Sequence, residues 1–311
     1  MAGPTGDSAG GDIFRTIVAR YGRNAGAARY MKRAMTGLVV AGVYASAAFA
    51  EDVTAAVPGH PGLTYETLLK LAMPGMAKDS DGSWDSGPLR HLRGLDDKPA
   101  QSEDKPPQDL QIAFTSIDTA TIREDGHNRL LLMTDGNSGG TGFDGVLAAF
   151  DLDGRAPRFL DYIDAGRDQW NGMSRIFALS PGTDAIVAFS SHSNSNQNYE
   201  MTTPIFLRGD KFKPVMTLFS YGSHACNYAT SQDATFVPRA ASGAPYSSIL
   251  IGVTIETEPG DSDCGDGTAQ ARHSKHIVSE LYRWDARVGA FRPTTGRIGK
   301  LSDKNWKDAA G

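Results

Sequence analysis

Cysteine is scarce in this chain, which has only Cys226 and Cys264 among its 311 residues. Two cysteines exclude a small scaffold held by several disulfides, and neither has the C-x-x-C spacing of a zinc site. In an oxidising compartment the pair is predicted to form one disulfide. Closing a loop of about 38 residues would stabilise the fold by roughly 3–4 kcal/mol. Half of a metal site, or two free thiols, are the alternatives.

Long hydrophobic runs are also scarce, and the one clear run lies near the N-terminus. Basic Lys32 and Arg33 precede an apolar and small-residue stretch from Leu38 to Ala47, and Ala48-Phe49-Ala50 has the form that signal peptidase cleaves. We therefore expect residues 1–50 to be a signal peptide region, with cleavage after Ala50 and the true start at Met31. An uncleaved signal anchor is the alternative. No twin-arginine pair is present, which favours Sec export and a periplasmic or secreted protein.

Basic residues are few once residues 1–50 are set aside. Those residues hold six of the 31 Lys and Arg and two of the 36 Asp and Glu, which leaves 25 basic and 34 acidic residues and a net charge near −9. An acidic surface argues against nucleic acid or an anionic membrane as the partner. No second long apolar run follows, so we expect no membrane span in the mature chain.

Residues 51–109 are predicted to form a helix followed by a linker. Residues 63–73 fit a short helix, with Thr64 as the N-cap and Pro74-Gly75 as the stop. From Lys78 to Gln108 the chain is rich in Asp, Ser, Gly, Pro and Lys, which predicts a mobile linker or a long surface loop.

From residue 110 to residue 301 the pattern changes to short β-rich runs separated by turn residues, which predicts an all-β domain followed by a tail at 302–311. The runs group into three four-stranded antiparallel meander units, whose second strands begin near residues 130, 186 and 249. Such repeated meanders are typical of β-propeller blades. A β-trefoil-like closure or a sandwich would accommodate the same runs.

In an antiparallel meander successive loops alternate between the two ends of the sheet. One end receives short turns, and the other, here called the polar end, receives five longer polar segments: 134–145, 164–172, 190–200, 221–233 and 256–276. The segment 190–200 reads SSHSNSNQNYE. Cys226 and Cys264 both fall at the polar end, as a disulfide requires. Function concentrates in loops held by a rigid scaffold, so any site is expected there, although polar loops also serve as plain solvated connections.

The first chemical candidate at the polar end is a cation site. Ca²⁺ takes six to eight oxygen ligands from carboxylates, amides and carbonyls. The proposed ligands come from two acidic segments: Asp135, Asn137, Asp144, Glu256 and Asp261. Ca²⁺ is thus a candidate cofactor, while acidic loops that only face water are the alternative. Convergence of His192 and His224 with His273 or His276 would instead indicate a transition metal.

The second candidate is a site for a polar ligand. Aromatic faces combined with Asn and His side chains suit the hydroxyl groups of a glycan. The polar end offers eight such residues: His192, Asn194, Asn196, Tyr199, Trp170, Asn171, His224 and Asn227. The structural alternative is that Asn and Ser side chains bond their own backbone and stabilise compact loops.

Together these features predict a secreted or periplasmic, non-enzymatic binding or envelope-associated protein. Its partner would be a small polar ligand, a glycan or an envelope protein. The alternative is a glycan or ester hydrolase at the same end. It would pair Asp135 or Asp144 with Glu256 or Glu200, and His192 would move the proton.

Overall fold

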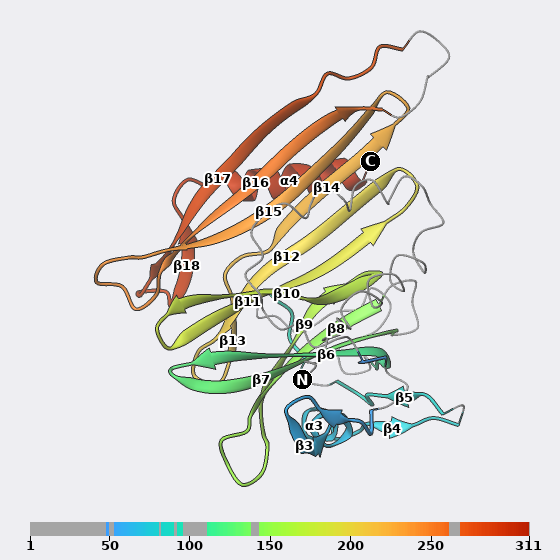
Figure 1. The fold of residues 1–311 in the computed structure, drawn as a ribbon, viewed down its shortest axis with the longest axis vertical. Coiled ribbons are helices and arrows are strands. Elements are labelled where there is room, and N and C mark those ends of the chain that lie inside the picture. Colours follow the sequence, from blue (N-terminus) through green and yellow to red (C-terminus); the bar gives the residue numbers. More distant parts are fainter. Residues whose placement is uncertain are drawn as a thin grey trace, which may run out of the picture. The chain divides into compact units, whose positions relative to one another are not determined.

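The structure is a computed structural model that describes residues 48–49, 53–80, 82–89, 92–95, 111–137, 143–260 and 268–310. These residues belong to one compact unit, Ala45–Gly311. The described part is mostly β-strand, with two helices, and its strand pairs within sheets are antiparallel (Figure 1). The all-β prediction is therefore confirmed. Apart from Ala48 and Phe49, the predicted signal peptide lies outside the described residues.

The first large sheet contains the first meander unit. Its four long strands are β6 (Ala113–Glu124), β7 (His127–Asn137), β8 (Phe143–Asp151) and β9 (Arg158–Arg167). Short strands extend it beyond β6: β5 (Trp84–Asp85), β4 (Ala77–Lys78) and β1 (Ala48–Phe49). A separate hairpin of β2 (Ala56–Val57) and β3 (His60–Thr64) leads into helix α3 (Tyr65–Ala72).

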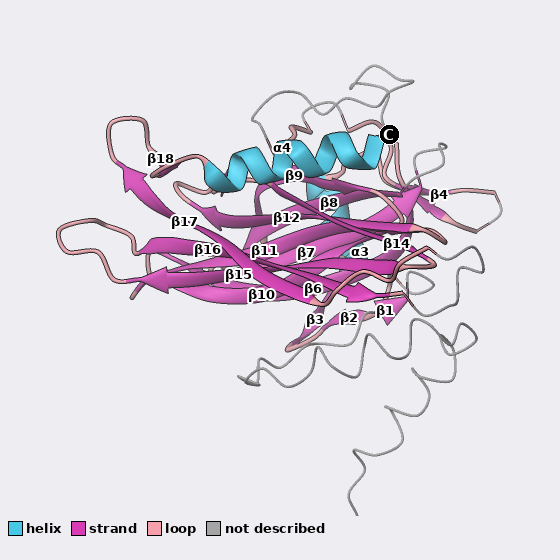
Figure 2. Ribbon diagram, turned by 90° about the horizontal axis from the view of Figure 1, so that it is seen from above, coloured by secondary structure: helices cyan, strands magenta, loops and turns pink. Residues whose placement is uncertain are grey.

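The second large sheet contains the second and third units. Its strands, in chain order, are β10 (Trp170–Ser180), β11 (Thr183–Ser193), β12 (Gln197–Leu207), β13 (Phe212–Pro214), β14 (Leu218–Ala225), β15 (Tyr228–Arg239), β16 (Ser248–Pro259), β17 (Ser274–Asp285) and β18 (Ala290–Pro293). All but β13 follow one another in the sheet, and β13 pairs with β12. Helix α4 (Arg297–Ala310) lies across this sheet (Figure 2).

The order of the meander strands matches the sequence analysis. The β-propeller-like arrangement that the sequence analysis named first is not confirmed. No closed sheet forms among the described residues, and neither a propeller-like nor a trefoil-like arrangement is confirmed. The second and third units run on in one sheet because β14 pairs with β15. Turn residues and alternating runs specify which neighbours pair locally, and they carry little information on where a sheet breaks.

The continuous apolar runs are strands that are buried on both faces. Leu130 and Leu132 of β7 face the cluster that also contains α3. Leu131 and Met133 of the same strand face a second cluster, which includes Ile186 of β11 and so joins the two large sheets. Successive side chains of a strand point to opposite faces, so burial on both sides requires an unbroken apolar run.

Polar contacts also fasten the two sheets to each other at both ends. Where the turns are short, the guanidinium of Arg123 in β6 donates to Asp184 of β11, from Nη2 to Oδ1 at 2.7 Å and from Nε to Oδ2 at 2.9 Å. At the polar end, Nδ2 of Asn171 in β10 donates to Oδ1 of Asp135 in β7 at 2.8 Å. The polar end is therefore held by contacts between sheets as well as by its own strand pairing.

The N-terminal helix agrees with its prediction. Oγ1 of Thr64 accepts a hydrogen bond from the backbone N–H of Thr67 at 3.3 Å, which is the expected N-cap contact. The segment after it is partly structured, because β4, β5 and buried Leu89 and Leu92 lie where a mobile linker was expected. Residues 96–110 of that segment lie outside the described residues.

The C-terminal helix was not predicted, because residues 302–311 were expected to form a tail. Glu280 of β17 caps its start and accepts hydrogen bonds from the backbone N–H groups of Thr295, Gly296 and Ile298. Burial alone would raise the pKa of Glu280, but these backbone donors bring it below its ordinary value. The cap comes from a residue outside the helix, so no capping motif within 297–310 indicates it.

Candidate functional site

The polar segment 190–200 is mostly strand, which corrects its description as a long loop. Strand β11 continues to Ser193 and β12 begins at Gln197, so only residues 194–196 connect them. Backbone pairing across this hairpin runs down to Ser193 and Asn198. The pairing satisfies the backbone whatever the side chains are, so polar side chains can be displayed along both strands.

Asp168 joins this hairpin to the segment between β9 and β10. Its Oδ1 lies 2.8 Å from Nδ1 of His192, and its Oδ2 accepts a short hydrogen bond from the hydroxyl of Tyr199. The predicted alternation of loops placed 164–172 and 190–200 at one end, and these contacts confirm it. Asp168 itself was not singled out in the sequence, because a lone Asp in a loop has no distinguishing pattern.

Aromatic rings continue this contact network toward the C-terminal helix. The His192 and Tyr199 rings stack with centroids 5.1 Å apart, and Tyr199 stacks on Phe219 of β14 at 5.0 Å. Phe219 meets Trp306 of α4 edge to face, also at 5.0 Å. Loss of contact with solvent and the Asp168 carboxylate raise the pKa of the Tyr199 hydroxyl well above its ordinary value, so Tyr199 stays protonated and donates.

Beside this network, strands β14 and β15 of the second sheet separate from each other. Strands β14 and β15 pair over only three residue pairs, from Ser223↔Thr230 to Ala225↔Tyr228, and β15 then continues alongside β16 alone. Asn305 of α4 bridges the two strands where they diverge. Its Nδ2 donates to the carbonyl of Phe219 at 2.8 Å and to Oε1 of Gln232 at 2.7 Å.

A recess of about 420 Å³ lies at this divergence, and both separating strands line it. Its walls come from five strands, which contribute Trp170, His192, Tyr199, Glu200, Ser220 and Asp233 among others. Strand β12 is its centre, because Glu200 lies directly between Ser191 of β11 and Ser220 of β14 in the sheet. Its size is within the range of small-molecule sites, roughly 300–1,000 Å³.

Two carboxylates and one buried hydroxyl set the chemistry of the recess. Partial removal from solvent raises the pKa of Glu200, and the nearby Asp233 carboxylate raises it further. The Oγ of Ser220 is buried and has no hydrogen-bond partner among the described residues, although Ser220 lines the recess. Leaving such a group unpaired costs roughly 1–3 kcal/mol, so the recess provides a polar position that the protein does not fill.

The other predicted ligand-binding residues fall into two groups. Trp170 lies in the recess wall and is 49 % exposed. Asn171 fastens the sheets, and Oδ1 of Asn194 accepts the backbone N–H groups of Asn196 and Gln197 in the hairpin turn. Structural hydrogen bonding therefore occupies Asn171 and Asn194.

Two further predicted residues contact neighbouring polar segments. The backbone N–H of His224 donates to the carbonyl of Asn196 at 2.9 Å, so these segments are adjacent, as the parity rule expects. Asn227 contacts the segment that returns to β17: its Nδ2 donates to Ala269 and its carbonyl accepts from Ala271. Because Cys264 lies outside the described residues, its disulfide with Cys226 stays a prediction.

The predicted cation ligands are divided between the two sheets. Burial raises the pKa of Asp135 in β7, hydrogen bonds from Asn171 and Gly136 oppose the shift, and the Asp144 carboxylate adds to it. Asn137 is described only in its backbone, and Asp261 lies outside the described residues. Glu256 is in the second sheet, on β16, where Lys275 approaches its Oε2 to 3.3 Å.

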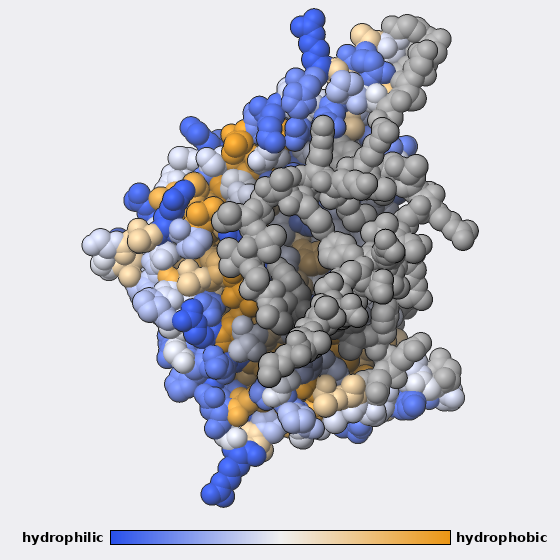
Figure 3. All heavy atoms as spheres, in the orientation of Figure 1, coloured by the Kyte–Doolittle hydropathy of each residue, from blue (hydrophilic) through white to orange (hydrophobic). Residues whose placement is uncertain are grey.

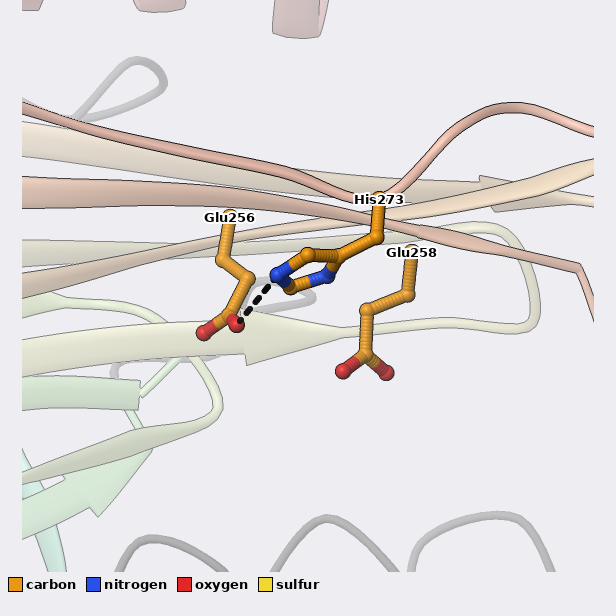
Figure 4. A group of neighbouring side chains, drawn as sticks. All are labelled: Glu256, Glu258 and His273. Atoms are coloured by element: carbon orange, nitrogen blue, oxygen red, sulfur yellow. Dashed lines mark ion pairs between the residues drawn. The ribbon is translucent and has the colours of Figure 1, made fainter.

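A different ligand set converges around Glu256. Glu256, Glu258 and His273 each place a possible metal-ligating atom within 4.8 Å of the others (Figure 4). Among the coloured atoms at the upper end of Figure 3, hydrophilic residues predominate. His273 is 57 % exposed and its Nε2 lies 3.8 Å from Oε1 of Glu256. The group is only partly buried, and Lys275 already neutralises part of the Glu256 charge, so it is a weaker site than the recess.

The comparisons with known proteins do not add a relative. No protein-family model, curated protein or solved structure matches the chain. Within the part of the chain that the structure describes, the helices are too short or too polar to cross a membrane.

Proposed function

We propose that this protein is a secreted or periplasmic, non-enzymatic binding protein, and that the recess between β14 and β15 holds a small polar ligand. The three meander units remain part of this proposal, with the first as the supporting layer and the others as the source of the site. An envelope-associated partner that presents such a polar group would use the same residues.

The unpaired hydroxyl of Ser220 is the observation that carries the proposal. Ser220 is 5 % exposed and lines the recess, and its buried Oγ has no hydrogen-bond partner among the described residues. Buried hydroxyl groups are nearly always bonded to protein, water or ligand. A ligand hydroxyl or carbonyl at this position would complete the bonding and would lie beside Glu200.

The test is a thermal-shift screen of small sugars, polyols, amines and amino acids against the purified protein and Ser220→Ala. We expect at least one compound to raise the melting temperature of the unmodified protein and to lose that effect in Ser220→Ala. The variant itself should be no less stable, because it removes an unpaired buried hydroxyl.

Thr202→Val is the matched control. Thr202 is also buried with an unpaired hydroxyl, but it does not line the recess. This variant should keep every ligand-induced shift. If no compound shifts the folded protein, or if Ser220→Ala and Thr202→Val respond alike, the binding proposal fails.

Hydrolysis is the second candidate function, and the contact between Asp168 and His192 favours it. A carboxylate that binds Nδ1 of a histidine orients the ring for proton transfer through its other nitrogen. Glu200 and Asp233 would supply the carboxylates. Turnover of chromogenic glycosides or esters that is abolished by His192→Ala, and strongly reduced by Asp168→Asn, would make hydrolysis the better assignment.

A further inference from the structure

The charges around the recess are of one sign. Glu200 and Asp233 contribute carboxylates, and none of the described residues that line the recess is Lys or Arg. His192 is the remaining side chain there that can carry positive charge, and its Nδ1 is already bound to Asp168. The recess therefore presents negative charge to whatever enters it.

The carboxylates of Glu200 and Asp233 repel each other when both are charged. Partial removal from solvent and the Asp233 carboxylate raise the pKa of Glu200, so a charged Glu200 is costly at neutral pH. A cation between them would relieve this repulsion. An uncharged sugar would accept or donate hydrogen bonds but would leave the electrostatic cost in place.

An exposed aromatic ring completes the arrangement. Trp170 of β10 lies opposite Ser191 of β11, which in turn pairs with Glu200 of β12, so one strand separates Trp170 from Glu200. Trp170 is about half exposed in the recess wall. Trp is the aromatic side chain that attracts cations most strongly through its ring face, and aromatic rings recognise quaternary ammonium ligands.

A metal ion fits the recess less well than an organic cation. The group of three converging carboxylate or imidazole ligands in the described part of the chain is Glu256, Glu258 and His273, which does not include Glu200 or Asp233. Ca²⁺ requires six to eight oxygens, and the recess offers two carboxylates with an aromatic wall. The volume of about 420 Å³ also suits a small organic molecule.

We infer that the ligand of this recess carries an alkylammonium cation beside a hydroxyl or carbonyl group. The cation would lie between Glu200, Asp233 and the face of Trp170, and the oxygen would bond to Ser220. This inference rests on the proposed binding function and specifies its ligand class.

The experiment is isothermal titration of the purified protein with choline and with its uncharged carbon analogue, in which a tert-butyl group replaces the trimethylammonium group. Ethanolamine, putrescine, glucose, glycerol and CaCl₂ are titrated in parallel. We expect an ammonium compound to bind at least about tenfold more tightly than the uncharged analogue. Glu200→Gln should remove most of that difference.

Asp303→Asn is the control for the overall acidic charge, because Asp303 is an exposed carboxylate on α4 outside the recess lining. It should bind as the unmodified protein does. Glucose, glycerol or the uncharged analogue could instead bind as tightly as choline, with no loss of binding in Glu200→Gln. That result would overturn the inferred ammonium ligand but keep the binding function. A response to CaCl₂ alone would replace the organic cation with a metal ion. No response to any compound would overturn both.

Discussion

Asn305 is predicted to hold the C-terminal helix against the split in the second sheet. It is 1 % exposed, donates two hydrogen bonds through Nδ2 and accepts a third from Nε2 of Gln232 at 3.0 Å. Each such bond contributes about 1 kcal/mol, and Asn305→Ala also leaves the Phe219 carbonyl without this partner. We therefore expect Asn305→Ala to lower the free energy of unfolding by about 3 kcal/mol.

The contribution of one contact can be isolated by a double-mutant cycle. Asn305 and Gln232 share two reciprocal amide hydrogen bonds, so Asn305→Ala and Gln232→Ala should couple by about 1–2 kcal/mol in urea unfolding. Asp303→Ala, on the exposed face of the same helix, should change stability by less than about 0.5 kcal/mol. Additive effects of the two substitutions, or equal effects of Asn305→Ala and Asp303→Ala, would refute the claim that α4 is fastened to the wall of the recess.

Four further predictions concern stability. Leu131→Ala, between the sheets, should cost about 2–5 kcal/mol in urea unfolding, whereas exposed Val288→Ala should cost little; similar losses would contradict the sandwiched core. Tyr199→Phe should cost about 1–2 kcal/mol because it removes the hydroxyl that donates to Asp168, and an unchanged melt would contradict that contact. The folded-state pKa of Glu200 lies above its ordinary value of 4.5, so this carboxyl group destabilises the fold at neutral pH. The penalty shrinks as the pH falls below the folded-state pKa and is gone below the ordinary value of 4.5. Glu200→Gln should therefore raise the melting temperature at about pH 7 and leave it unchanged at about pH 3.5, and the opposite pH trend would contradict the raised pKa. Reduction of the predicted Cys226–Cys264 disulfide should lower stability by roughly 3–4 kcal/mol, and identical melts with and without reductant would argue for free thiols.

Local features of the fold could be predicted because their causes are local in the sequence. The apolar runs of β7 and β11 are unbroken since both faces are buried, and Thr64 lies where a helix N-cap is required. Hairpin order follows from the same runs and their turns. The closure of the sheets could not be predicted, because it depends on whether β14 pairs with β15 or ends a separate unit, and three residue pairs decide that.

The candidate site was predicted in its location but only partly in its residues. Alternation of loops placed His192, Tyr199 and Trp170 at one end, and the recess includes all three. Ser220 and Asp233 were not singled out, although Asp233 belongs to the polar segment 221–233 and Ser220 directly precedes it, because nothing in the sequence distinguishes them from the other polar residues there. The recess forms where β14 and β15 separate, and the sequence of a single strand does not indicate such a separation.

Helix α4 was missed for a related reason. Ile298, Leu301 and Asn305 share one face at helical spacing, but the last of them is polar and bonds to two strands. A hydrophobic pattern interrupted by Asn favours an exposed tail over a docked helix. The stabilising partners, Glu280 and Gln232, are distant in sequence and become neighbours only in the folded chain.

The most direct test of the recess as the binding site is an amide NMR titration of the ¹⁵N-labelled protein with choline. Shifts that concentrate at residues 198–200, 220–222 and 232–234, and that are lost in Ser220→Ala, are the predicted result. Shifts confined to the first sheet, or to Glu256, Glu258 and His273, would contradict the assignment of the site, and an unchanged spectrum at saturating choline would contradict its ligand class.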